Sequence, residues 1–261
     1  MTRMKPASPL TRTLFGSLRA EITVLGRATG IRICAAALLF LVILVFYSSS
    51  EPAWADVSRG FYFDQAFVLL GLYGSLLTAI AGAFVGGKDH EWRTRPWRFA
   101  VDGRKALLSA RLILLALLSL VCVIVCAGLG GLLDAMGGHG SHGAGALAAR
   151  MGYVWGVMVF WGLVGFVVSS LSRSFAWGVA APFVWVVLEP LVDFYLPAGI
   201  AGILPMWNIK IILRSLFPNQ DGTLAVILPA PGSSAGSGMI FAIYLAVALG
   251  LSCVAGLRRD R

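Results

Sequence analysis

The chain has 261 residues, of which 58% are hydrophobic and only 13% are charged. A soluble domain of this size would have too little polar surface, so the composition excludes a soluble protein and indicates an integral membrane protein. The net charge of +9 does not imply a nucleic-acid partner, because the basic residues are spread over segments that flank apolar runs, where anionic lipid headgroups attract them.

Residues 1–30 predict an amphipathic helix lying in the cytoplasmic interface of the membrane. Ser8 and Pro9 have the pattern of an N-cap followed by proline in the first turn. Apolar residues then recur at helical spacing, namely Leu10, Leu14, Leu18, Ile22 and Leu25, and arginines lie on the other side. Glu21 falls within the apolar arc, so we expect a protein partner for its carboxylate. A cleaved signal peptide is the alternative interpretation of this segment.

Six apolar runs have the length that crosses a bilayer as a helix, roughly 17–25 residues. They occupy residues 31–48, 65–87, 107–133, 151–171, 175–196 and 238–257. Most of the 21 Lys and Arg residues precede the first run, lie between the second and third, or follow the last. Because basic residues favour the inner side, both termini are expected in the cytoplasm. The sequence therefore predicts an all-α, multi-pass domain over 31–261 in a membrane, and the richness in Ala, Gly and Arg is typical of a bacterium.

The stretch from Gly82 to Asp89 resembles a P-loop in every position except the final Ser or Thr. A P-loop needs a strand before its glycines and free backbone N–H groups after them, whereas an apolar helix is predicted here. We interpret Gly82 and Gly86 as a small-xxx-small helix contact, like Gly152 and Gly156. Any nucleotide is then bound by another chain.

The sequence contains no arrangement that predicts a catalytic or metal centre. His90 and Glu91 begin an HExxH-like pattern, but Thr94 stands where the second histidine is needed. His139 and His142 lie in a glycine-rich segment that would not preorganise a metal site. The four cysteines all fall inside apolar runs, so neither a disulfide framework nor a zinc knuckle is expected. We expect a chain that is not an enzyme and holds no cofactor of its own.

The segment 197–237, between the fifth and sixth runs, is apolar although it lies on the outer side. The stretch 203–217, which includes Trp207, predicts a short helix that dips into the outer leaflet.

Two acids and two bases near this segment form a second group of candidate residues. Glu189 and Asp193 share a helix face at membrane depth, where an acid must be paired or hydrated. Lys210 and Arg214, also one turn apart, are candidate partners. The group is interpreted either as a structural ion-pair network or as part of a gate or a site for a cationic substrate.

Three motifs, in chain order, resemble the membrane permease subunit of ABC-2 type transporters, also described as type V ABC exporters. The first is Leu18-Arg-Ala-Glu21, before the first run, and the third is Leu257-Arg-Arg-Asp260, similar to the RRD near the end of many members. The second extends over 87–111; its matching positions are Glu91, Thr94 and Arg104, with Arg111 in place of a lysine and Arg93 in place of a glycine.

The resemblance implies that the permease binds no ATP itself. A separate ABC ATPase, which carries ATP and Mg, docks on the cytoplasmic face, and two ATPases assemble with two permeases, identical or homologous. The loop 87–106 would form a coupling helix that transmits ATPase closure to the spans, and re-entrant elements within 197–237 would close the outer end of the pathway. The implied activity is export of a hydrophobic or amphipathic compound such as an antibiotic, a peptide or a lipid.

Two sets of residues follow from these interpretations. The residues expected to contact the ATPase are Glu21, Asp89, Glu91, Arg93, Thr94, Arg98 and Arg104. The residues expected along the substrate path or gate are Glu189, Asp193, Lys210, Arg214 and Trp207. For the first set the alternative is a solvated loop of membrane-flanking charges, and for the whole chain it is a six-span scaffold without transport activity.

Overall fold

The computed structural model describes residues 9–27, 62–91, 103–136, 144–195, 202–217 and 234–257, and within these ranges it contains helices and no strands. In chain order the helices are α1 (Pro9–Arg27), α4 (Tyr62–Leu69), a π-helical segment η1 (Leu70–Gly74), α5 (Ser75–Glu91), α7 (Arg104–Met136), α8 (Ala144–Ser172), α9 (Phe175–Tyr195), α11 (Pro205–Leu216) and α13 (Ser234–Leu257). The expected all-α class is therefore confirmed for the described residues.

Three of these helices are long and apolar enough to cross a membrane: Arg104–Met136, Gly145–Ser172 and Ala235–Leu257. A fourth candidate is the pair Ala66–Leu72 and Ser75–Lys88, which is bent by 41°. In α9 the apolar stretch Phe175–Val186 is shorter than a full span. The predicted run 31–48 lies outside the described residues, so the structure supports three or four spans, and the number six stays a prediction.

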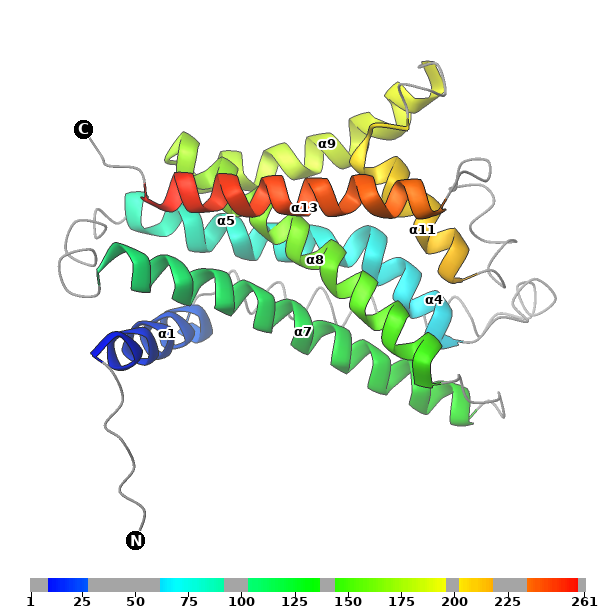
Figure 1. The fold of residues 1–261 in the computed structure, drawn as a ribbon, viewed down its shortest axis with the longest axis horizontal. Coiled ribbons are helices and arrows are strands. Elements are labelled where there is room, and N and C mark those ends of the chain that lie inside the picture. Colours follow the sequence, from blue (N-terminus) through cyan, green and yellow to red (C-terminus); the bar gives the residue numbers. More distant parts are fainter. Residues whose placement is uncertain are drawn as a thin grey trace, which may run out of the picture.

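The long helices run side by side along the long axis of the molecule (Figure 1). α5, α8 and α9 contact one another, and α13 contacts α8. α1 lies against α7 near one end of this bundle, whereas α11 lies against α13 near the other end (Figure 1). α1 and α11 therefore occupy opposite ends of the bundle.

Glycines bring the backbones of α5 and α8 into contact. A Cβ atom added at Gly82 would lie 1.9 Å from the carbonyl oxygen of Gly162, and one added at Gly86 would lie 2.6 Å from that of Phe166. From the other side, a Cβ at Gly165 would lie 2.1 Å from the carbonyl oxygen of Ala79. The predicted small-residue contact at Gly82 and Gly86 is confirmed, because only glycine allows this approach.

Gly152 and Gly156 make no such close contact with the part of the chain that the structure describes. Among these residues, a Cβ at Gly152 would meet nothing within 4 Å, and one at Gly156 would make an ordinary 3.6 Å contact with the ring of Phe241. α8 packs closely against α5 at Gly165 and at the carbonyl group of Gly162, about two to four turns further along the helix. The sequence contains both pairs, and only the packing of the helices selects between them.

Hydroxyl groups also join α5 to α8. Thr78 donates a hydrogen bond from Oγ1 to the carbonyl oxygen of Met158 at 2.7 Å, and Ser169 donates from Oγ to that of Ala83 at 2.7 Å. Each such bond between membrane helices contributes about 0.6 kcal/mol on average. These bonds satisfy the hydroxyl groups of two polar residues within otherwise apolar helices.

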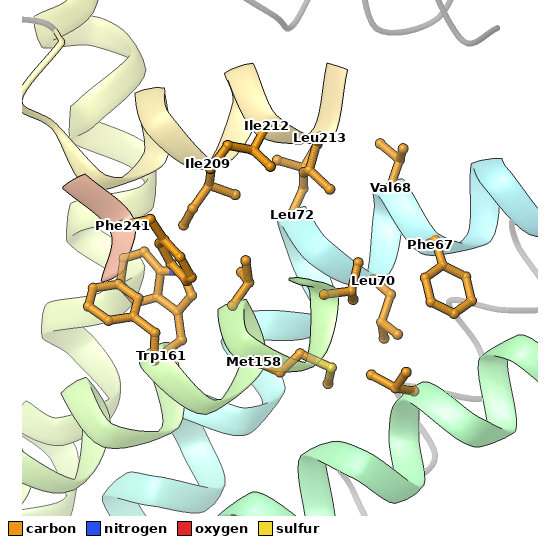
Figure 2. Packing of buried hydrophobic residues seen from close by; sticks show 14 of the residues in the cluster. Phe67, Val68, Leu70, Leu72, Met158, Trp161, Ile209, Ile212, Leu213 and Phe241 are labelled. Atoms are coloured by element: carbon orange, nitrogen blue, oxygen red, sulfur yellow. The ribbon is translucent and has the colours of Figure 1, made fainter. Parts of the chain in front are cut away.

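The bend between α4 and α5 coincides with η1, whose π-helical turn interrupts the α-helical hydrogen-bond pattern. The bend brings η1 against α11, since a Cβ at Gly71 would lie 3.3 Å from the side chain of Leu213. Figure 2 shows Leu70, Leu72, Met158 and Leu213 in one buried cluster, so α11 packs into the core of the bundle and does not only lie on its surface.

Replacing Gly82 by Ala should destabilise the protein, because its Cβ would push the carbonyl group of Gly162 away and separate α5 from α8. We expect a loss of about 1–3 kcal/mol in the free energy of unfolding in detergent, the usual range for overpacking. Gly152→Ala is the matched control, since the same methyl group there meets open space. Equal stability of the two variants would contradict the close contact.

Candidate functional site

Helix α1 turns an acidic residue toward the bundle. Ser17 and Glu21, one turn apart, are fully buried, whereas Phe15 is 70% exposed and Ile22 is 50% exposed. The predicted apolar arc is therefore only partly the buried face: Leu18 packs against the bundle, but Ile22 points outward. The rotation of α1 about its axis is set by Glu21. A buried carboxylate needs polar partners, and such partners lie only on the side of α1 that faces the bundle.

Two basic residues surround the carboxylate of Glu21. Lys88 of α5 donates from Nζ to Oε2, and Arg111 of α7 donates from Nε to Oε1 at 3.2 Å. All three side chains are buried, with exposed fractions of 0% for Glu21, 1% for Lys88 and 6% for Arg111. The partner expected for Glu21 is thus found in the same chain. We call these three residues the Glu21 cluster.

The Glu21 cluster joins three helices that are far apart in the sequence, namely α1, α5 and α7. Lys88 lies in the last turn of α5, and Arg111 lies two turns after the start of α7. Between those two helices lies the predicted coupling loop. The Glu21 cluster therefore connects α1 with both helices that flank this loop, and it brings together residues from the first and second motifs.

The other residues expected to contact an ATPase surround this position along the chain. The backbone of Asp89 and Glu91 ends α5, and Arg104 begins α7. The side chains of Asp89 and Glu91, and the whole of Arg93, Thr94 and Arg98, lie outside the described residues. Their role in docking stays a prediction.

Glu189 of α9 holds the start of α11. Its Oε1 accepts a hydrogen bond from the backbone N–H of Trp207 at 2.9 Å, and its Oε2 accepts one from the indole Nε1–H of Trp185 at 2.5 Å. Trp207 lies in the first turn of α11, where N–H groups have no acceptor within the helix and where the helix dipole favours a negative charge. The carboxylate therefore acts as an N-terminal cap supplied by another helix.

Of the other charged residues expected along the substrate path, the structure describes the side chains of two. Lys210 is buried on α11, and Arg214 lies in its last turn. The side chain of Asp193 lies outside the described residues. Charge spacing alone suggested Lys210 and Arg214 as partners for Glu189, and it missed both tryptophan donors. The backbone N–H of Trp207 leaves no mark in the sequence, whereas Trp185, one helical turn before Glu189, was a signal that could have been found.

A further ion pair was missed by sequence reasoning. Arg150 of α8 donates from Nη1 to Oδ1 of the fully buried Asp64 of α4 at 2.6 Å. The guanidinium of Arg150 also lies 5.0 Å from the ring centre of Phe217, immediately after α11. Asp64 and Arg150 each directly precede one of the predicted apolar runs, and both of these runs are expected to begin on the same side, so their pairing was predictable from the span boundaries.

The P-loop-like segment has no P-loop geometry. Residues from Gly82 to Asp89 belong to α5, so their backbone N–H groups serve the helix, and Lys88 binds Glu21. Among the described residues, no three His, Cys, Asp or Glu side chains are grouped so that they could hold a metal ion.

Neither a protein-family model nor a curated protein sequence matches this chain. The family resemblance therefore depends on the motifs of the sequence and on where the structure places their residues.

Replacing Glu21 by Ala should destabilise the protein by about 3–5 kcal/mol, because it leaves the buried Lys88 and Arg111 without their carboxylate. The charge exchange Glu21→Lys with Lys88→Glu should recover part of that loss, since it again places one acidic and two basic side chains in the buried cluster. Chemical unfolding in detergent measures both effects. Arg19→Gln, on the exposed side of α1, is the control and should change little. Failure of the exchange to recover any stability would contradict a specific cluster.

Replacing Glu189 by Ala should release the first turn of α11. Hydrogen exchange at the Trp207 amide should accelerate about tenfold or more, because a hydrogen bond to a charged acceptor contributes about 1.5–3 kcal/mol. Mass-spectrometric hydrogen exchange of the peptide containing Trp207 measures this. Ser215→Ala, at the other end of α11, should leave that peptide unchanged. If Trp207 stayed protected in the Glu189 variant, another group would be its acceptor.

Proposed function

We propose that the chain is the membrane-spanning permease subunit of an ABC transporter, in which a separate ATPase drives export of a hydrophobic or amphipathic compound. The observation that carries this proposal is the Glu21 cluster. Two of the three motifs that resemble the permease family meet in it, although Glu21 and Arg111 are 90 positions apart in the chain.

The cluster supports a mechanical role for the loop between α5 and α7. A force applied to that loop by ATPase closure acts on the end of α5 and the start of α7, and the buried ion pairs transfer it to α1 as well. Breaking these pairs while the charges stay buried is costly, so the three helices move as one body. Such a body, shifting between two packed arrangements, couples ATP hydrolysis to the spans.

The outer end provides the corresponding gate in this proposal. α11 is held at its start by Glu189 and near its end by Phe217, which contacts Arg150. Release of these contacts would open a path between the helices. Lys210, Arg214 and Asp193 are the remaining charged residues of the proposed path.

The proposed assembly lies in a bacterial plasma membrane, with six spans and both termini in the cytoplasm. α1 lies in the cytoplasmic interface, where the exposed Phe15 and Ile22 would contact lipid. Two ATPase subunits and a second permease, identical or homologous, complete the transporter. ATP and Mg belong to the ATPase.

Purification from the native host in mild detergent, followed by mass spectrometry and an ATPase assay on the same sample, tests this proposal. We expect an ABC ATPase to accompany the chain, and we expect Glu91→Lys to abolish co-purification and ATPase stimulation, because it reverses a charge at the docking loop. Arg173→Gln, at the turn between α8 and α9, is a control for a charge change elsewhere on the same side.

Two results would oppose the proposal in different ways. Intact co-purification of the Glu91 variant would remove Glu91 from the docking surface without removing the ATPase. A wild-type protein that carries no ATPase would favour a membrane scaffold without transport activity.

A further inference from the structure

A small cavity lies between α5, α7, α8 and α13, at the end of the bundle where Glu21 of α1 meets Arg111. Its volume is about 10 Å³, which is the space that one water molecule or one small ion requires. Two polar residues line it, namely Arg111 of α7 and Ser170 of α8. The other lining residues are glycines and apolar residues of the four helices, so the chemistry of the cavity is set by the arginine and the serine.

The hydroxyl group of Ser170 faces this cavity. Ser170 is only 9% exposed, and its Oγ forms no hydrogen bond with any residue that the structure describes. The other serines in this part of α8 differ, because Ser169 donates to a carbonyl oxygen of α5 and Ser172 to one of its own helix. Gly86 keeps the space beside the hydroxyl open, since a Cβ atom at this lining glycine would lie 2.9 Å from Ser170 Oγ. A buried hydroxyl group in this position indicates a ligand in the cavity.

The guanidinium of Arg111 brings positive charge to the same cavity. Arg111 is 6% exposed, and its Nε donates to Oε1 of Glu21. A guanidinium carries N–H donors and no acceptor, so it can offer an occupant only donors. The Glu21 cluster contains one acid and two bases, so electrostatics favour a further negative charge beside Arg111.

We propose that this cavity binds a chloride ion, which accepts hydrogen bonds from the hydroxyl of Ser170 and from the guanidinium of Arg111. The lining favours an anion over a water molecule. Water needs acceptors for its own hydrogens, and among the described residues that line the cavity only the Ser170 side chain can accept one. The small volume excludes polyatomic anions such as sulfate and phosphate.

A bound chloride would connect α8 to the Glu21 cluster. Ser170 lies in the last turn of α8, and Arg111 already joins α7 to α1. The ion would therefore stabilise the packing of these helices at one end of the bundle. The proposal depends only on the fold and on the chemistry of the cavity, and it does not depend on transport activity.

Thermal unfolding of the full chain in detergent tests the proposal. Tryptophan fluorescence gives the melting temperature as chloride or bromide replaces gluconate at constant ionic strength. A ligand that binds only the folded state stabilises it in a saturable way, so we expect a rise of about 5 °C or more at roughly a hundredfold excess of either halide over its dissociation constant. A wild-type melting temperature that does not change with halide would overturn the proposal.

Ser170→Ala removes one of the two donors. We expect the midpoint of the chloride titration to move to about a tenfold higher concentration, because a hydrogen bond to a charged group is lost. Ser172→Ala is the matched control, since this exposed serine lies on the same helix and its Oγ donates to the carbonyl oxygen of Val168. It should leave the midpoint unchanged. A loss of stability in Ser170→Ala that is equal in gluconate and in chloride would overturn the proposal, by identifying water as the occupant.

Bromide in crystals of the wild-type protein gives a readout that needs no variant, which keeps the test decisive if Ser170→Ala does not fold. We expect an anomalous scattering peak between Arg111 and Ser170. Absence of a peak there, at a bromide concentration that saturates the thermal shift, would overturn the assignment of the ion to this cavity.

Discussion

The close approach of α5 and α8 is the constraint on which the rest of the bundle depends. At Gly82 and Gly165 the two backbones are separated by so little space that no side-chain carbon fits between them. Apolar side chains are as well solvated by lipid as by protein, so this dense contact, together with the hydroxyl bonds of Thr78 and Ser169, supplies attraction that hydrophobicity alone does not provide in a bilayer. α9 then packs against both helices.

Charged residues connect the elements at the two ends of this bundle. At one end Glu21 of α1 binds Lys88 and Arg111, and at the other Asp64 binds Arg150. Buried ions are costly when separated from their partners, so each group holds its helices in a defined arrangement. The glycine contacts of α5 and α8 already fix how these two helices face each other, and the charges at the ends fix the rotation of α1, α4 and α7 against them.

The helices α1 and α11 are held by different means. α1 is anchored by side-chain ion pairs from one of its faces, which leaves Phe15 and Ile22 pointing outward. α11 is anchored through its own backbone, because Glu189 accepts the Trp207 N–H at its first turn. In the proposed transporter these helices would lie at opposite ends of the spans. An event at α1 would then reach α11 by two routes: through α5 and the bend at η1, and through α7 and α13, since α13 contacts both α7 and α11.

The sequence by itself determined the helical class, the presence of helices apolar and long enough to cross a membrane, and the need of Glu21 for a partner, because these follow from composition, from the length of apolar runs and from the cost of burying a charge. It also suggested Gly82 and Gly86 as contact residues, but the same local pattern at Gly152 and Gly156 makes no close contact with the described residues, so the pattern alone did not select the pair. Only the tertiary structure decided which residues pair with Glu21, which glycines of α8 contact α5, and that Glu189 caps α11. Those outcomes depend on how each helix is rotated about its axis and how far it is shifted along its neighbours. A helix with apolar residues on every side has no polar face in its sequence from which its rotation or its shift could be predicted.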